Sequence, residues 1–152
     1  MRSMRTIAVG AALLVLPAWR ALAAQAERFV LVGPNVKTAI VIGSEQPKYR
    51  FPYWGGHAIL QRYLMLITRD ADDKGGITVP IVKDADLAGK DLDALYDFRI
   101  WVGDQPRVRD VLGADLARID DDGFIIRAAG RDLYICGKRI WGTHWAVYDL
   151  LE

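Results

Sequence analysis

The chain has 152 residues, enough for one domain, and its 20 Lys and Arg residues nearly balance 19 Asp and Glu residues. Such a balance lacks the concentrated basic charge of nucleic-acid-binding domains, so nucleic acid is excluded as a partner. Cys136 is the only cysteine, which excludes an intramolecular disulfide. Because it lies in the apolar segment 133–136, we expect a buried, unreactive thiol rather than a reactive one or a link between two chains.

Residues 1–23 have the features of a cleavable secretory signal peptide. A basic start at residues 1–5 precedes an apolar run over 6–19, and Ala21 and Ala23 are the small residues expected before the cleavage point. The apolar run is shorter than the ~20 residues that span a bilayer, so we expect no membrane attachment after cleavage. The domain is then residues 24–152, secreted or periplasmic. Cleavage after Ala26 and a retained N-terminal anchor are the alternatives.

Beyond the signal peptide, strand-like and helix-like segments alternate along the chain. Strands are predicted over 29–32, 38–42, 78–82, 98–102, 124–128 and 132–136. Helices are predicted over 57–69, 92–96, 105–112 and from 140 to the end, with a loop over 44–56. Pro80 lacks an N–H group and so places its strand at an edge or a bulge. This order predicts an α/β sandwich, a mixed sheet with helices packed on it and a C-terminal hairpin plus helix.

The terminal helix is the most aromatic of the predicted elements. Four large side chains recur along it at helical spacing: Trp141, Trp145, Tyr148 and Leu151. We expect this stripe to lie on the sheet, with Thr143 capping the start of the helix. Loss of Trp145 should then destabilise the domain strongly, because truncation of a buried Trp costs about 3–5 kcal/mol. For the helix over 105–112, Asp104 is the predicted N-cap.

The sequence yields no catalytic, cofactor-binding or metal-binding set of residues. The segment 70–75 begins like a calcium loop, but Lys74 and Ile81 occupy positions that need oxygen ligands, so a solvated turn is favoured. The acidic segment 120–123 is also predicted to be a turn. His57 and His144 have no partner in a recognisable zinc or nucleophile motif, so a structural role near a helix start is favoured for both.

Two glycine-containing segments and one aromatic loop leave alternatives open. The amides of 54–57 precede a helix and could hold an anion, and the segment 103–104 follows a strand. Neither completes a phosphate-binding motif, so turns are favoured. The loop aromatics, which could stack on sugars, are Tyr49, Phe51, Tyr53 and Trp54. Packing against a neighbouring domain is favoured for them, because aromatic clusters are common in interface cores.

The last third of the chain carries a recognisable pattern. It reads DGFIIR over 122–127, LYICG over 133–137 and GTHWAVYDLLE over 142–152. A hairpin followed by a helix of this kind resembles the N-terminal domain of alpha-glucuronidases, glycoside hydrolase family 67. Similar domains precede the barrel of beta-hexosaminidase-like secreted enzymes. The order of the earlier strands and helix also resembles these domains, so the resemblance extends over most of residues 29–152.

This resemblance implies a non-catalytic accessory domain, residues 24–152, of a secreted glycoside hydrolase that degrades polysaccharide such as glucuronoxylan. Hydrolysis in that family belongs to carboxylates on a following (β/α)8 barrel, so no catalytic residue is assigned here and the barrel is the expected partner. We expect the sequence up to Glu152 to be part of a longer polypeptide. A free-standing exported carbohydrate-binding module and a structural envelope domain are the alternatives.

Overall fold

The computed structural model describes residues 31–44, 55–70, 72 and 74–152. The strands are β1 (Thr38–Ile42), β2 (Ile81–Lys83), β3 (Phe98–Val102), β4 (Phe124–Ala129) and β5 (Asp132–Gly137). The helices are α1 (Gly56–Ile67), α2 (Leu92–Leu95), α3 (Pro106–Leu116) and α4 (Ile140–Leu151), and η3 (Asp84–Leu87) is a 3-10 turn.

The strands form one mixed sheet in the order β2-β1-β3-β5-β4. Strands β2, β1, β3 and β5 run parallel, and β4 pairs antiparallel with β5 through the predicted hairpin. The central strands β1, β3 and β5 are almost entirely buried and mostly apolar, with Thr38, Arg99 and Asp132 as buried polar exceptions, as expected for parallel strands covered on both faces. The predicted fold class is therefore confirmed: an α/β sandwich with a mixed sheet, a C-terminal hairpin and a final helix.

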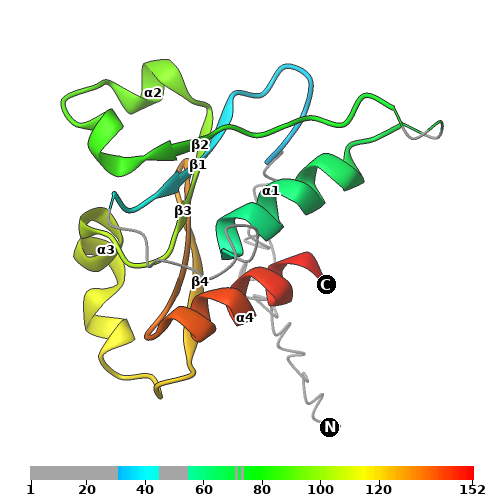
Figure 1. Cartoon of the computed structure of the whole chain (residues 1–152). Coiled ribbons are helices and arrows are strands. Elements are labelled where there is room, and N and C mark those ends of the chain that lie inside the picture. Colours follow the sequence, from blue (N-terminus) through cyan, green and yellow to red (C-terminus); the bar gives the residue numbers. More distant parts are fainter. Residues whose placement is uncertain (1–30, 45–54, 71, 73) are drawn as a thin grey trace, which may run out of the picture.

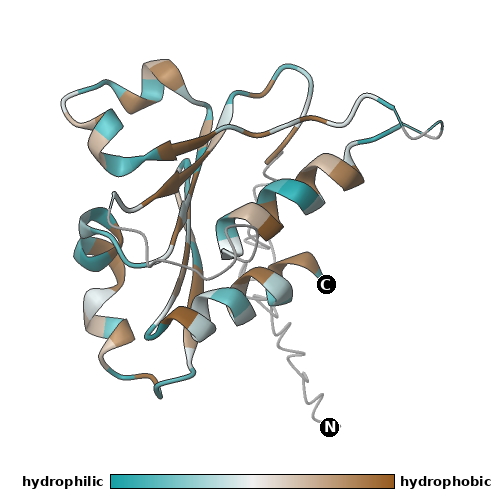
Figure 2. Ribbon diagram, viewed as in Figure 1, coloured by the Kyte–Doolittle hydropathy of each residue, from teal (hydrophilic) through white to brown (hydrophobic). Residues whose placement is uncertain are grey.

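Helices cover both faces of this sheet. Figure 1 shows α1 and α4 on one side, with α2 and α3 on the other. Side chains alternate between the two faces along each strand, so Ile100 and Val102 of β3 pack in the layer of α1 and α4, whereas Trp101 packs in the layer of α3. In Figure 2 the strands between the two layers are largely apolar. The domain thus has two apolar clusters that share one sheet.

Most predicted element boundaries lie within a few residues of the observed ones. The strand predicted over 78–82 is the shorter β2, and it lies at the sheet edge, as Pro80 indicated. The Pro80 carbonyl still accepts the Ile40 N–H at 2.9 Å. The strand predicted over 29–32 is wrong in its described part, because residues 31 and 32 belong to no strand. Residues 29 and 30, like most of the predicted loop over 44–56, lie outside the described residues.

The three aromatic members of the predicted α4 stripe do not lie on the sheet, so that prediction is wrong for them, whereas the fourth member, Leu151, packs against the apolar cluster. Trp141, Trp145 and Tyr148 are 60, 54 and 43 % exposed. The buried face of α4 is made instead of mostly smaller residues: Gly142, Thr143, His144, Ala146 and Val147. Small side chains let the helix backbone approach the sheet, and large ones on the same face would hold it away.

Two glycines set this close approach at the start of α4. A Cβ atom on Gly137, at the end of β5, would lie 2.3 Å from the Gly142 carbonyl carbon and 2.3 Å from the Thr143 nitrogen. The prediction that Thr143 caps the start of α4 is wrong. Its Oγ1 accepts the Gly137 N–H at 2.9 Å and so ties the first turn of the helix to the end of the strand, while Arg139 occupies the N-cap position.

The cap predicted for α3 is also wrong. Gln105, not Asp104, occupies the N-cap position, and its side chain makes no capping hydrogen bond. The Asp104 carboxylate accepts two hydrogen bonds from Arg109, at 2.6 and 3.0 Å. A guanidinium one turn further along the helix therefore takes the place that backbone N–H groups would fill in a capped helix.

Candidate functional site

A cavity of about 580 Å³ lies at the carboxyl ends of the parallel strands. The residues that follow β1, β3 and β5 line it: Gly43, Ser44, Gly103, Asp104, Gly137 and Lys138. From β1 the chain passes to β2 on one side, whereas β3 lies on the other side of β1. Ligands of open α/β sheets bind in the crevice at such a point, and ligand cavities commonly measure about 300–1,000 Å³.

Three helices begin at this cavity, where Gly56 of α1, Pro106 of α3 and Ile140 of α4 line the wall. None of the three has a side-chain cap among the described residues, and none has an acidic residue in its first turn. The short helix α2, by contrast, is capped by Asp91. First-turn N–H groups lack partners within a helix, so the cavity receives the positive ends of three helix dipoles.

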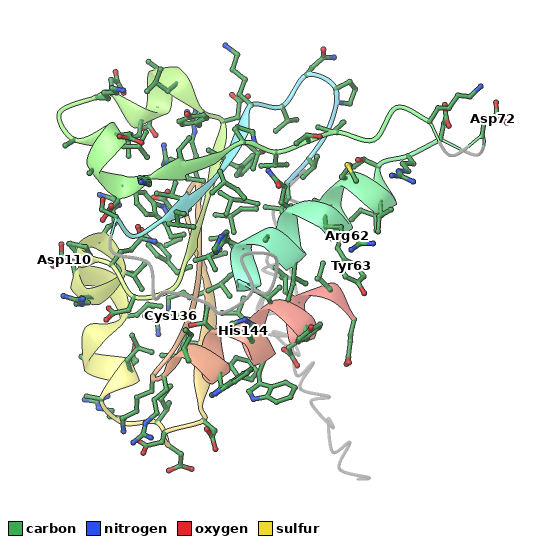
Figure 3. The ribbon with its side chains drawn as sticks, in the orientation of Figure 1. Arg62, Tyr63, Asp72, Asp110, Cys136 and His144 are labelled. Atoms are coloured by element: carbon green, nitrogen blue, oxygen red, sulfur yellow. The ribbon has the colours of Figure 1, made fainter. Side chains whose placement is uncertain are left out.

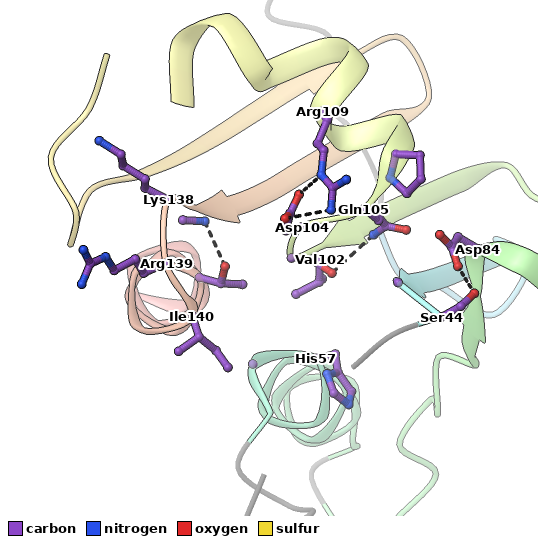
Figure 4. Close-up of a pocket in the computed structure, with 16 residues that line it drawn as sticks. Ser44, His57, Asp84, Val102, Asp104, Gln105, Arg109, Lys138, Arg139 and Ile140 are labelled. Carbon is purple, nitrogen blue, oxygen red and sulfur yellow. Dashed lines mark hydrogen bonds and ion pairs between the residues drawn. The ribbon is translucent and has the colours of Figure 1, made fainter. Parts of the chain in front are cut away.

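Gln105 forms the wall between β1 and β3 (Figure 4) and is only 1 % exposed. Its Nε2 donates to the Val41 carbonyl at 3.1 Å and to the Val102 carbonyl at 3.4 Å. Carbonyl oxygens cannot donate, so the amide nitrogen must face them. The Oε1 atom is left without a hydrogen-bond partner among the described residues. A buried acceptor without a partner costs about 1–3 kcal/mol.

The cationic side chains near the cavity are all engaged with other groups of the protein. Lys138 donates to the Ile119 carbonyl at 2.8 Å, and Arg139 pairs with Asp121. In Figure 4 both side chains extend away from the cavity. Arg109, as described above, pairs with Asp104. The positive potential of the cavity therefore comes mainly from backbone N–H groups.

The other acidic side chain of the cavity is also paired. Asp84, in η3, accepts a hydrogen bond from the Ser44 hydroxyl and a second, at 2.8 Å, from the Ala85 N–H. Ser44 follows β1 and Asp84 follows β2, so this contact joins the ends of two neighbouring strands. Both carboxylates that line the cavity are thus engaged within the protein.

The two histidines occupy different positions. His57 lines the cavity, and burial, with a further contribution from the charge of His144, lowers its pKa below the ordinary value. His144 is buried in α4, where its Nδ1 lies 2.9 Å from the Ile140 carbonyl oxygen. This contact gives His144 the structural role expected from the sequence. His57, at the start of α1, belongs to the cavity wall.

The two glycine segments singled out in the sequence meet at this cavity. Gly56 starts α1, and Gly103 follows β3 with a φ of +83°, a left-handed conformation that favours glycine. The sequence could not show this meeting, because it depends on the strand order. Sequence reasoning also missed Gln105, which reads as an ordinary polar residue before a helix. The aromatic loop of residues 49–54 lies outside the described residues.

The face of the sheet that α2 and α3 cover holds a buried group of charges, which the sequence analysis also missed. Asp132 accepts hydrogen bonds from Arg99 at 2.6 Å and from Trp101 at 2.7 Å, and Arg107 lies 3.4 Å away. Burial disfavours the charged carboxylate, but hydrogen bonds from Arg99 and Trp101 outweigh it and hold the pKa of Asp132 below its ordinary value. Asp93 of α2 pairs with Arg99 from the other side. Because its members satisfy one another, this group ties α2 and α3 to the sheet.

The remaining candidate residues have structural surroundings. Cys136 is fully buried, as predicted, and burial raises the pKa of its thiol to about 12 (Figure 3). Asp70 accepts the Asp72 and Lys74 N–H groups, which closes the predicted turn. The Gly123 N–H donates to the Asp120 carbonyl at 2.9 Å, so the acidic segment before β4 is also a turn. Within the described residues, no three His, Cys, Asp or Glu side chains gather as a metal site.

A second surface feature is the outward side of α4, which we call the aromatic face: Trp141, Trp145 and Tyr148. The rings of Trp145 and Tyr148 lie 6.3 Å apart between centroids. The neighbouring helix α1 buries Leu60 and Leu64, and its half-buried Ile59 packs against the same apolar cluster. Three large side chains of α1 are exposed: Tyr63, Leu66 and Ile67. Tyr63 projects from α1 on the side nearer α4 (Figure 3).

Comparison of the sequence with known protein families and with characterised proteins finds no match. Among the described residues, no helix has both the length and the apolar character needed to cross a membrane.

Proposed function

We propose that this protein is a non-catalytic accessory domain of a secreted glycoside hydrolase, and that its aromatic face packs against the (β/α)8 catalytic domain. The observation that carries the proposal is the exposure of Trp141, Trp145 and Tyr148 on a helix whose opposite face is fixed to the sheet. Large exposed aromatic groups of this kind mark interaction surfaces. The resemblance of residues 122–152 to the N-terminal domain of alpha-glucuronidases supports the choice of partner.

The exposed aromatic groups are not needed to hold α4 in place. Ala146 and Val147 are fully buried in the apolar cluster, and Thr143 bonds to the end of β5. The outward side chains are therefore free to serve another contact. Aromatic residues are enriched in interface cores, where tryptophan and tyrosine often supply most of the binding energy.

The surface extends onto α1, which packs beside α4 in the same layer. Exposed Tyr63 and Ile67 add apolar area there. An apolar surface of two neighbouring helices suits a permanent contact between domains better than a transient one. In the polysaccharide-degrading enzyme, such as one that acts on glucuronoxylan, this domain would steady the barrel and leave the hydrolysis to it.

The test uses the protein together with the (β/α)8 domain encoded at its own gene locus, in the same reading frame or beside it. We expect Trp141→Ser combined with Trp145→Ser to shorten the half-life of glycosidase activity at elevated temperature about tenfold. The matched control is Val111→Ser, which removes an exposed apolar side chain from α3 in the opposite layer. That variant should leave the half-life unchanged.

Three results would contradict the proposal. One is a locus that encodes no such barrel. Another is a half-life that the double variant does not change. The third is binding of xylan oligosaccharides to the aromatic face of the protein alone, which would favour the free-standing carbohydrate-binding module instead.

A further inference from the structure

We propose that the cavity at the carboxyl ends of β1, β3 and β5 binds a small organic anion that also carries a hydroxyl group. This proposal goes beyond the docking role of the aromatic face and does not depend on it. The cavity and the aromatic face are lined by different residues.

The anionic part of the ligand follows from the three uncapped helices. Each helix N-terminus carries the equivalent of about half a positive charge, and N–H groups of a first turn are ready-made anion ligands. Here α1, α3 and α4 all begin at one cavity, with no acidic residue in any first turn. Since Asp104 is paired with Arg109, it does not cancel this potential.

The hydroxyl group follows from Gln105, which is an independent observation. Its amide nitrogen is committed to the Val41 and Val102 carbonyls, so its orientation is fixed, and Oε1 remains as a buried acceptor without a partner on a residue that lines the cavity. An acceptor needs a donor, which a carboxylate, sulfate or fully ionised phosphate cannot provide. A hydroxyl group on the same ligand provides one, either directly or through a bound water.

These two requirements describe a class of ligand rather than one compound. Hydroxylated carboxylates and phosphate esters of small polyols both meet them, and a volume of about 580 Å³ accommodates either. D-Glucuronate and glycerol 3-phosphate represent the two sources of the anionic group. Sulfate is the matched anion without a hydroxyl, and glucose is the matched polyol without a charge.

The experiment is an NMR titration of the exported protein with these four compounds, following the backbone amides. We expect glycerol 3-phosphate or D-glucuronate to shift the first-turn amides of α1, α3 and α4 in a saturable way. The compound that binds with the higher affinity shows whether the cavity prefers a phosphate or a carboxylate group. Sulfate should bind at least fivefold more weakly, and glucose should give no shift at these amides.

A charge variant tests whether the binding occurs in the cavity. Pro106→Glu places a carboxylate in the exposed first turn of α3, where it competes with the anion while interacting favourably with the helix dipole. We expect affinity to fall at least tenfold. Val111→Glu adds the same charge to an exposed position further along α3 and should change affinity less than twofold.

The proposal is overturned if neither hydroxylated anion binds saturably, or if Pro106→Glu binds as tightly as the unmodified protein. Equal affinity for sulfate would overturn the role of Gln105 as acceptor for a hydroxyl donor. Both variants leave the aromatic face intact, so failure here is distinguishable from failure of the docking proposal.

Discussion

The two faces of the central sheet are held by different chemistry. On the side of α1 and α4 the packing is apolar and close, with Gly137 and Gly142 at the nearest approach. On the side of α2 and α3 a buried group of charges centred on Asp132 lies beside the apolar cluster. One layer therefore depends on shape and the other on paired charges. The two should respond to different perturbations, one to added volume and the other to pH.

The largest effect should come from filling the close approach with Gly137→Ala. The new Cβ would meet backbone atoms of Gly142 and Thr143 at 2.3 Å, and a backbone cannot turn aside as a flexible side chain can. We expect a loss of about 3 kcal/mol or more, against a total stability of about 5–15 kcal/mol for a domain. Urea unfolding measures it.

Gly113→Ala is the matched control for this change. Gly113 lies within α3, and a Cβ there would have no neighbour within 4 Å. Alanine favours helix more than glycine, so this variant should be up to about 1 kcal/mol more stable. Equal destabilisation by the two variants would mean that shape does not control the α4 layer.

The second effect concerns the charged layer. Asp132→Asn removes the charge that balances Arg99, which is almost fully buried, and weakens the hydrogen bond from Trp101. Breaking a buried ion pair by removing one partner typically costs 3–5 kcal/mol. Asp93 still pairs with Arg99, so we expect a value near the lower end, about 3 kcal/mol. If urea unfolding gives less than about 1 kcal/mol, Asp132 does not hold this layer together.

Acid should weaken the same layer selectively. The folded-state pKa of Asp132 is lowered, so its stabilising contribution is present above the unfolded-state pKa of about 3.9 and is lost as pH falls through the folded value. Stability measured between pH 6 and pH 3 should therefore fall less steeply for Asp132→Asn than for the unmodified protein. Parallel pH curves for the two proteins would show that another carboxylate governs the loss.

Much of the fold could be predicted from local patterns, and the errors have a common cause. The strand over 38–42 and the hairpin were readable because β-branched and alternating residues report local conformation. The exposure of the α4 aromatic residues could not be predicted in this way, because helical spacing shows that side chains share a face but not which face of the helix packs on the sheet. The small residues Gly142 and Ala146 were the better indicator, because they permit close approach. The cavity could not be predicted, since Gln105 and three helix starts meet only through the strand order.

The smallest effect should come from Trp145→Ala, although the sequence alone predicts a steep loss. Trp145 is 54 % exposed, and its described ring contact is with Tyr148 on the same face. Losing an exposed aromatic pair removes less than about 1 kcal/mol.

Val147→Ala is the matched control, because Val147 lies two residues further along α4 and is fully buried. This variant should lose about 2 kcal/mol of stability through lost burial and the cavity left behind. Thermal melting followed by circular dichroism separates the two variants. If Trp145→Ala melts as early as Val147→Ala in the isolated protein, the aromatic face is already covered there and is not available to a partner domain.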